Sequence, residues 1–302
     1  MNESELIEES RTEFLLVSKQ LDDLLLKQEI FWCQRSRVSW LKYGDKNTKI
    51  FHSKASQRRR RNYIEGIKNA NGVWVEKVKE VAKVASNYFM NIFKAGTCDR
   101  MEDCLTTVPN KLTDEIREVL SRPYSSEEVK VALFQMGPTK APGPDGMNAI
   151  FYQKFWHIIG NKVTDAVLDF LHSSNMEPDV NYTHIVLIPK VKKPKKMADF
   201  RPISLCNVIY KIISKVLANK LKLILPQIIP PTHNAFVPGR LITDNVLVAY
   251  ETLHAMHIRR KGKNGVLALK LDVNKAYDRV KWSFLKDMMI KLGFSKVGWI
   301  GL

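Results

Sequence analysis

The apolar positions of the chain recur mostly with the period of an α-helix. Residues 1 to 30 carry leucines near helical spacing and predict an amphipathic helix. Residues 208 to 225 (VIYKIISKVLANKLKLIL) place apolar side chains on one stripe and lysines opposite, which predicts a second helix. Residues 147 to 159, 161 to 173 and 239 to 260 show similar spacing. The pattern therefore predicts a largely helical chain.

Shorter β-prone runs lie between these helices. Residues 64 to 75 (IEGIKNANGVWV) have an Asn-Gly turn between two such runs and predict a hairpin. Residues 184 to 190 (HIVLIPK) and 198 to 205 (ADFRPISL) predict two strands joined by a basic loop. The apolar run 266 to 269 predicts a buried strand that leads to Asp272. A buried carboxylate needs a partner or a metal ion, so Asp272 is a candidate functional residue.

Charge narrows the class of partner. The chain has 302 residues and 48 Lys+Arg against 31 Asp+Glu, a formal net charge of +17. This length allows two or three structural units, and the charge favours an anionic partner, nucleic acid before anionic membrane. No apolar run approaches the roughly 20 residues of a membrane span, and the acidic N-terminus is no signal peptide. The four cysteines show no CxxC spacing, so neither a zinc site nor a disulfide framework is indicated.

One basic segment follows an acidic one. Residues 1 to 30 hold eight acidic and three basic side chains, whereas residues 31 to 70 hold eleven basic and two acidic ones. Aromatic residues interleave these cations, as in proteins that grip single-stranded nucleic acid. A solvated basic helix with its aromatics in the core is the alternative. The candidate phosphate contacts are Arg58, Arg59, Arg60 and Arg61, which also fit a nuclear-import sequence.

Two further segments could meet a nucleic-acid strand. Residues 137 to 146 (GPTKAPGPDG) are rich in glycine and proline, so neither a helix nor a strand is expected there. They form either a rigid connector or a loop that presents Lys140 to a nucleic-acid strand. Residues 185 to 222 hold ten basic residues and one acidic residue, Asp199. The basic loop between the two predicted strands, with Lys192 and Lys193, is either a flap over phosphates or a solvated face.

Five motifs in this order resemble a known family. KAPGPDG, LIPK, ADFRPISL, AFVPGRLITDN and LKLDVNKAYDRV are similar to the reverse transcriptase of plant LINE-type, non-LTR retrotransposons. Residues 31 to 65 also resemble the segment that these polyproteins carry between endonuclease and polymerase. The resemblance covers nearly the whole chain.

The resemblance implies roles for individual residues. Asp272 matches the first catalytic carboxylate, which with the main-chain carbonyl of Val273 would bind Mg²⁺ in a two-metal site. Tyr277 matches the ring that excludes a ribose 2′-hydroxyl. Arg201 matches the finger arginine that holds the dNTP triphosphate, and Lys190 is a weaker candidate for that role.

The implied fold class is α+β. Residues 1 to 110 would form a helical and hairpin extension with an RNA-binding linker, and residues 111 to 302 the fingers and first part of the palm of a right-hand polymerase. The family's remaining metal carboxylates lie in a downstream Asp-Asp motif, and the only Asp-Asp pair here is Asp22-Asp23. We therefore expect an N-terminal fragment, truncated before the second catalytic motif and inactive alone.

Three functional hypotheses follow. The first is an RNA-directed DNA polymerase fragment whose partners are an RNA template, a DNA primer and dNTP. The second is a non-enzymatic RNA- or single-stranded-DNA-binding protein derived from a retroelement. The third is an interaction module that uses the helix at residues 1 to 30. A nuclear or cytoplasmic location is expected.

Overall fold

The computed structural model describes residues 3–36, 48–94, 96, 100–259, 266–272 and 276–294. The chain divides into two compact units, which are described separately. The first comprises Met1–Ala85 and Val186–Ile203, and the second comprises Ser86–Ile185 and Ser204–Leu302. These units follow spatial contacts, and the domain boundary expected at residue 110 stays a prediction.

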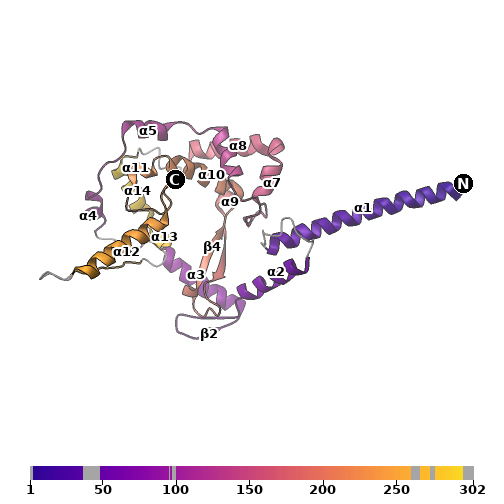
Figure 1. Cartoon of the computed structure of the whole chain (residues 1–302), viewed down its shortest axis with the longest axis horizontal. Coiled ribbons are helices and arrows are strands. Elements are labelled where there is room, and N and C mark those ends of the chain that lie inside the picture. Colours follow the sequence, from indigo (N-terminus) through magenta and orange to yellow (C-terminus); the bar gives the residue numbers. More distant parts are fainter. Residues whose placement is uncertain are drawn as a thin grey trace. The chain divides into compact units, whose positions relative to one another are not determined.

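The first unit contains two whole helices, the first half of a third, a small hairpin and most of a second hairpin (Figure 1). Its elements are α1 (Glu3–Ser36), α2 (Thr48–Asn62), β1 (Ile67–Lys68), β2 (Trp74–Val75), the first half of α3 (Val78–Phe93), most of β3 (His184–Pro189), a 3-10 turn (Met197–Asp199) and most of β4 (Phe200–Leu205). Strands β1 and β2 form one two-stranded sheet, and β3 and β4 form another.

The hairpin predicted at residues 64 to 75 is confirmed. Strands β1 and β2 are antiparallel, with Ile67 opposite Val75 and Lys68 opposite Trp74. The side-chain oxygen of Asn69 accepts hydrogen bonds from the backbone N–H groups of Asn71 and Val73, both at 3.0 Å. Gly72 has a φ of +80°, which a residue without Cβ adopts at no steric cost. Local turn chemistry therefore explains this element.

The second unit is helical around one main core. Its elements are α4 (Met101–Thr106), α5 (Asp114–Ser121), α6 (Ser126–Phe134), α7 (Ala149–Lys154), α8 (Trp156–Ser173), α9 (Pro178–Asn181), α10 (Val208–Lys222), α11 (Leu225–Ile228), α12 (Ile242–Ile258), α13 (Ala276–Arg279) and α14 (Trp282–Leu292). Val129, Leu133, Val167 and Ile212 are fully buried where α6, α8 and α10 meet. The helices predicted at residues 161 to 173 and 208 to 225 correspond to α8 and α10, and the segment predicted at 147 to 159 forms α7 and the first turn of α8.

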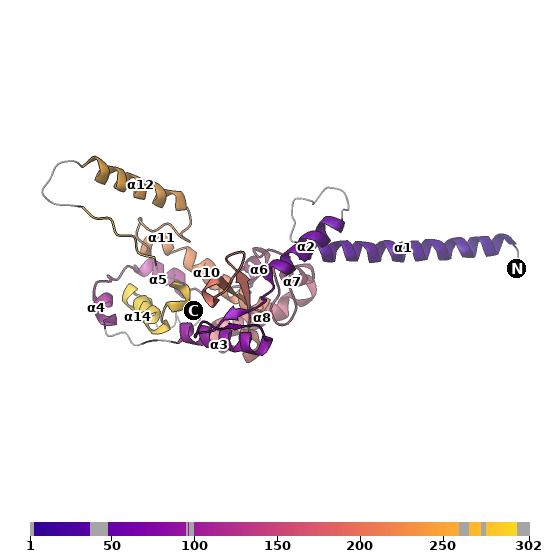
Figure 2. The same cartoon turned by 90° about the horizontal axis from the view of Figure 1, so that it is seen from below.

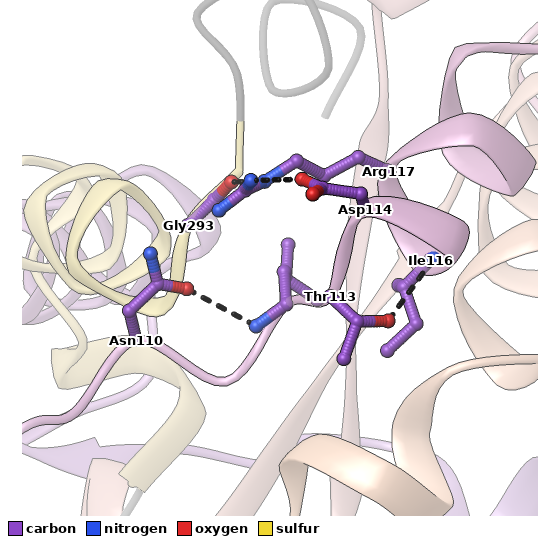
Figure 3. Close-up of polar contacts among 7 residues, drawn as sticks. Asn110, Thr113, Asp114, Ile116, Arg117 and Gly293 are labelled. Carbon is purple, nitrogen blue, oxygen red and sulfur yellow. Dashed lines mark hydrogen bonds and ion pairs between the residues drawn. The ribbon is translucent and has the colours of Figure 1, made fainter.

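A second apolar cluster joins α5, α11 and the end of α14. Leu112, Ile116, Ile224, Ile228 and Phe294 are its buried members. Figure 3 shows the polar contacts at its margin: Arg117 donates to the carbonyl of Gly293 at 3.4 Å and pairs with Asp114 at 2.7 Å. Chain segments far apart in sequence are held together here.

Helix α12 packs little against the rest of its unit. None of its side chains is buried, and Val246, Leu247 and Tyr250 are about 60% exposed or more. Figure 2 shows α12 standing apart from α10 and α14. Within the described ranges, no helix combines the length and apolar character needed to cross a bilayer.

The prediction of a buried strand before Asp272 is wrong. Residues 266 to 272 are described, but they form neither strand nor helix. Val266, Leu267, Leu269 and Leu271 are between 51% and 86% exposed. A strand needs a neighbouring strand for its backbone groups, and in the described part of the chain no strand pairs with this segment.

Candidate functional site

The flap predicted from two strands and a basic loop is present as a hairpin. The backbone N–H of Lys190, just after β3, donates to the carbonyl of Asp199, just before β4, at 2.7 Å. The Lys190 ammonium donates to the carbonyl of Ala198 at 3.0 Å. Lys190 therefore helps to close the loop, while its side chain stays exposed. Phosphate binding by this loop remains a prediction.

Asp199 shapes the loop through its carboxylate. Its Oδ2 accepts hydrogen bonds from the backbone N–H groups of Lys195 and Lys196, both at 2.9 Å. These two bonds lower the pKa of Asp199 below its ordinary value. The one acidic residue of this basic stretch is thus engaged with the backbone. Around it, the side chains of Lys192, Lys193, Lys195 and Lys196 are exposed.

Arg201 lies on β4 with an exposed side chain. It follows Phe200, which is fully buried and fixes this end of the strand. Because neighbouring residues on a strand point to opposite faces, burial of Phe200 directs Arg201 outward. A planar guanidinium so placed can meet a phosphate with two hydrogen bonds.

The first unit brings the two basic stretches of the sequence together. Residues 48 to 68 and the loop 190 to 199 both belong to it. The backbone N–H of Lys68 in β1 donates to the carbonyl of Lys195 in the loop at 2.9 Å. Segments more than a hundred residues apart in sequence therefore touch, which the sequence pattern did not predict.

Helix α2 carries the densest positive charge. Arg58, Arg59, Arg60 and Arg61 are all exposed, and the last turn holds three of them. Cations in the last turn also complement the negative end of the helix dipole. The tetrad is thus available to an anionic partner.

The aromatic residues of the same segment divide into two groups. Phe51 is 3% exposed, and the ring of Trp32 lies 3.7 Å from that of His52, so these residues pack α1 against α2. Tyr63, 70% exposed, is free to stack on a base. Phe51, one of the aromatic residues interleaved with these cations, is therefore not available to stack on a base. Two others, Trp40 and Tyr43, lie outside the described residues.

The loop 137 to 146 is docked against the start of α10. The Lys211 ammonium donates to the carbonyl of Ala141 at 3.0 Å, and the Asn207 side-chain oxygen accepts from the backbone N–H of Asp145 at 3.4 Å. Lys140 is exposed beside this fixed segment. The alternative of a rigid connector is consistent with these contacts, and contact between Lys140 and a strand stays a prediction.

Asp272 is exposed and lies in an irregular segment. The expectation of a carboxylate at the end of a palm strand is therefore wrong for the chain in this structure, since the strand is not formed. Val273, the expected main-chain ligand, lies outside the described residues.

Tyr277 lies on α13 with 79% of its side chain exposed. Its ring centroid is 6.3 Å from that of Phe236 in an edge-on arrangement. Tyr277 and Asp278 also line an open cavity of about 730 Å³ together with Tyr88, Phe93 and Trp282. An exposed ring at this position can contact a ligand.

The described residues fit the expected metal only in part. Mg²⁺ prefers several oxygen ligands, and Asp272 offers one carboxylate. No group of three histidine, cysteine, aspartate or glutamate side chains gathers anywhere in the described ranges. A metal bound by this part of the chain would keep most of its waters.

Arg240, which the sequence pattern does not single out, organises the segment before α12. Its NH1 donates to the carbonyls of Pro230 and His233 at 2.6 and 2.7 Å, and its NH2 to those of Pro226 and Ile229 at 3.0 and 3.1 Å. The residue stands in the AFVPGR motif after Gly239, whose φ is +78°. Two prolines and a glycine near one arginine were the available indication.

Comparisons with known proteins show what the C-terminal part of the chain is similar to. Residues 191–301 match the family model described as reverse transcriptase (RNA-dependent DNA polymerase). This segment has the sequence pattern of a reverse transcriptase domain. It contains Arg201, Asp272 and Tyr277, whereas Arg58 to Arg61 and Lys140 precede it.

Curated relatives extend the similarity upstream. The transposon TX1 uncharacterized 149 kDa protein of Xenopus laevis is 28% identical over 256 residues, 83% of this chain and 19% of that protein. The Pol polyprotein of the type-2 retrotransposable element R2DM of Drosophila melanogaster is 25% identical over 59% of this chain and 17% of its own length. The Pol polyprotein of the type-1 retrotransposable element R2 of Nasonia vitripennis is 25% identical over 74% of this chain and 22% of its own length. The chain thus spans about a fifth of the length of these relatives.

Proposed function

We propose that the chain carries the fingers and the first catalytic motif of the RNA-directed DNA polymerase of a non-LTR retrotransposon. The match of residues 191–301 to the reverse transcriptase family is the observation that carries the proposal. The order of the motifs supports the plant LINE type, and the right-hand polymerase fold follows from the same resemblance. RNA template, DNA primer and dNTP are the proposed partners, in the nucleus or cytoplasm.

In this proposal the residues of the chain have separate tasks. Asp272 contributes one carboxylate to a Mg²⁺ site that other carboxylates must complete, and the metal would activate the primer hydroxyl and neutralise the leaving phosphates. Arg201 holds the triphosphate, with Lys190 nearby in sequence, and Tyr277 restricts the sugar. The flap lysines and the arginines of α2 hold the nucleic-acid backbone.

Binding of RNA by the first unit can be tested with the 302-residue polypeptide. Fluorescence anisotropy with two unrelated single-stranded RNAs should give similar affinities that fall steeply with salt, by about 0.7 in the log–log slope per phosphate contact. Replacing Arg58 to Arg61 by alanine should weaken the binding of both RNAs alike and reduce the slope of the log–log salt dependence. Four exposed lysines of other elements provide a control with the same charge change: Lys79, Lys83, Lys130 and Lys162. Affinity that does not respond to salt would refute the proposed interface.

The second candidate is a non-enzymatic RNA-binding protein. The exposed position of Asp272, outside any strand, favours it. Primer extension separates the two candidates, in a longer polypeptide that also supplies the remaining metal carboxylates. There Asp272→Asn should abolish DNA synthesis and leave RNA binding intact, because an amide has no charge for Mg²⁺, and Tyr277→Ala should admit ribonucleotides. Equal synthesis by the wild type and Asp272→Asn would contradict the catalytic assignment.

A further inference from the structure

Helix α1 has an apolar stripe that no described residue of its own unit covers. The helix has 34 residues and is therefore about 50 Å long. Its contacts with α2 lie at its C-terminal end, around Trp32. In the preceding turns six apolar side chains are between 55% and 71% exposed, and four of them recur at intervals of three and four residues: Phe14, Val17, Leu21 and Leu24. We call these four residues the α1 seam.

The spacing of the α1 seam is that of a coiled coil. The intervals of three, four and three residues place Phe14 and Leu21 at positions a of a heptad, and Val17 and Leu24 at positions d. Side chains with this repeat meet a partner helix along one line, each inserting between side chains of the facing helix. A second helix is therefore the shape that fits this stripe.

We propose that the α1 seam binds the same seam of a second copy of this chain, with the two helices antiparallel. In such a pair Phe14 of one copy faces Leu24 of the other, and Leu21 faces Val17. The same four side chains thus cover each other, and the interface is self-complementary, as a two-fold symmetric dimer requires.

The flanking charges select the antiparallel arrangement. Glu13 and Lys27 both lie at positions g, and in the antiparallel pair Glu13 of one copy lies beside Lys27 of the other, twice by symmetry. A parallel pair would set Glu13 beside Ser18 and Lys27 beside Trp32 instead. It would also bring two acidic ends together, since residues 1 to 13 hold five acidic side chains and one basic. Opposite charges across a helix pair set partner orientation.

The interface is small, so the dimer should be reversible. Four seam side chains from each copy provide less than the roughly 2,000 Å² or more of an obligate dimer. We expect dissociation in the micromolar range and a dimer that keeps the arginines of α2 exposed, because the seam ends before the contact with α2.

Sedimentation equilibrium of the nucleic-acid-free 302-residue protein tests the proposal. The wild type should pass from monomer to dimer across micromolar concentrations. Leu21→Glu should raise the dissociation constant roughly thirtyfold or more, as for a central interface residue. Leu26→Glu is the matched control: Leu26 is 52% exposed against 55% for Leu21, but lies on the opposite face, and its dimer should persist. At protein concentrations above the dissociation range, circular dichroism should show equal helix content in Leu21→Glu and Leu26→Glu.

Charge exchange tests the orientation. Glu13→Lys and Lys27→Glu should each weaken the dimer a few-fold, and the double variant should recover wild-type affinity because the pair is restored with its signs reversed. A double variant that is no better than the single ones would overturn the antiparallel arrangement. A wild type that stays monomeric, or equal effects of Leu21→Glu and Leu26→Glu, would overturn the proposal itself.

Discussion

Asn207 packs directly on Gly143, so that a Cβ atom on Gly143 would stand 2.5 Å from the backbone nitrogen of Asn207. The Asn207 amide also donates to the carbonyl of Asp179 at 2.9 Å. One side chain at the start of α10 therefore joins the loop 137 to 146 and the first turn of α9. The glycine in the middle of KAPGPDG is required by this close approach of two backbones.

Gly143→Ala should destabilise the second unit. The added methyl group meets backbone atoms, which cannot move aside as a flexible side chain can, and overpacking of this kind costs about 1–3 kcal/mol. Gly137→Ala in the same loop is the control, because its Cβ would meet only the flexible side chain of Lys140, at 3.1 Å. Urea denaturation of both variants measures the difference, and equal midpoints would contradict the account.

Arg240→Lys should cost about 2 kcal/mol of stability or more, since hydrogen bonds to charged groups contribute about 1.5–3 kcal/mol each and an ammonium cannot reach all four carbonyls. Arg259→Ala, an exposed arginine after α12, should change stability little. Thermal unfolding compares the two. If Arg240→Lys matched the wild type, the four carbonyls would have to be satisfied in another way.

Asp199→Asn should weaken the flap by about 1 kcal/mol at neutral pH, the scale of a hydrogen bond lost or weakened. The pKa of Asp199 lies below 3.8 in the folded chain because the carboxylate accepts two backbone hydrogen bonds. Its stabilisation is therefore complete above pH about 4 and is lost as the pH falls through the window below 3.8. Unfolding free energies of wild type and variant should converge in acid. A gap that persists there would contradict this role.

Because of Lys220, the free energy of unfolding should increase as the pH rises through the alkaline range. Burial lowers its pKa below 10.5 in the folded chain, although Glu128 opposes part of this shift. In the window below 10.5 the unfolded chain holds the proton more tightly, so stability increases as the pH rises towards that value.

The comparison variant is Lys220→Met, which should lack this rise. The wild-type ammonium lies 3.9 Å from the ring centroid of Tyr124 and donates to the carbonyl of Arg122. Burial also raises the pKa of Tyr124, so only the difference between wild type and variant at each pH isolates the lysine. If the unfolding free energies of the wild type and of Lys220→Met changed in parallel from neutral pH to 10.5, this role of Lys220 would be refuted.

Local features of the fold could be predicted from the sequence because neighbouring residues cause them. Ser125 and Glu128 form a capping box, whose residues are three apart in sequence, and the Glu128 side chain accepts from the backbone N–H of Ser125 at 2.8 Å. Thr113 caps α5 by accepting from the N–H of Ile116 at 3.4 Å (Figure 3). The hairpin at Asn71-Gly72 depends in the same way on its own turn residues.

Contacts between distant segments could not be predicted. Nothing in the spacing of residues indicates that Lys68 bonds to Lys195, or that Asn207 meets Gly143, because such pairs depend on how the elements pack. The prediction of a strand before Asp272 was wrong for a related reason. An apolar run specifies that burial is favourable, but a strand forms only where a neighbouring strand supplies hydrogen bonds.

The open segment before Asp272 has a consequence for handling the protein. Its sequence, VLALKL, is β-prone, contains no proline and has one charge, and its backbone is not paired within a sheet. Such a segment can add strands from other molecules and nucleate cross-β fibres. During synthesis in a cell, intermolecular pairing would compete with folding, so yield should fall as expression level rises. Leu269→Lys should delay fibre formation followed by thioflavin fluorescence, without altering RNA affinity.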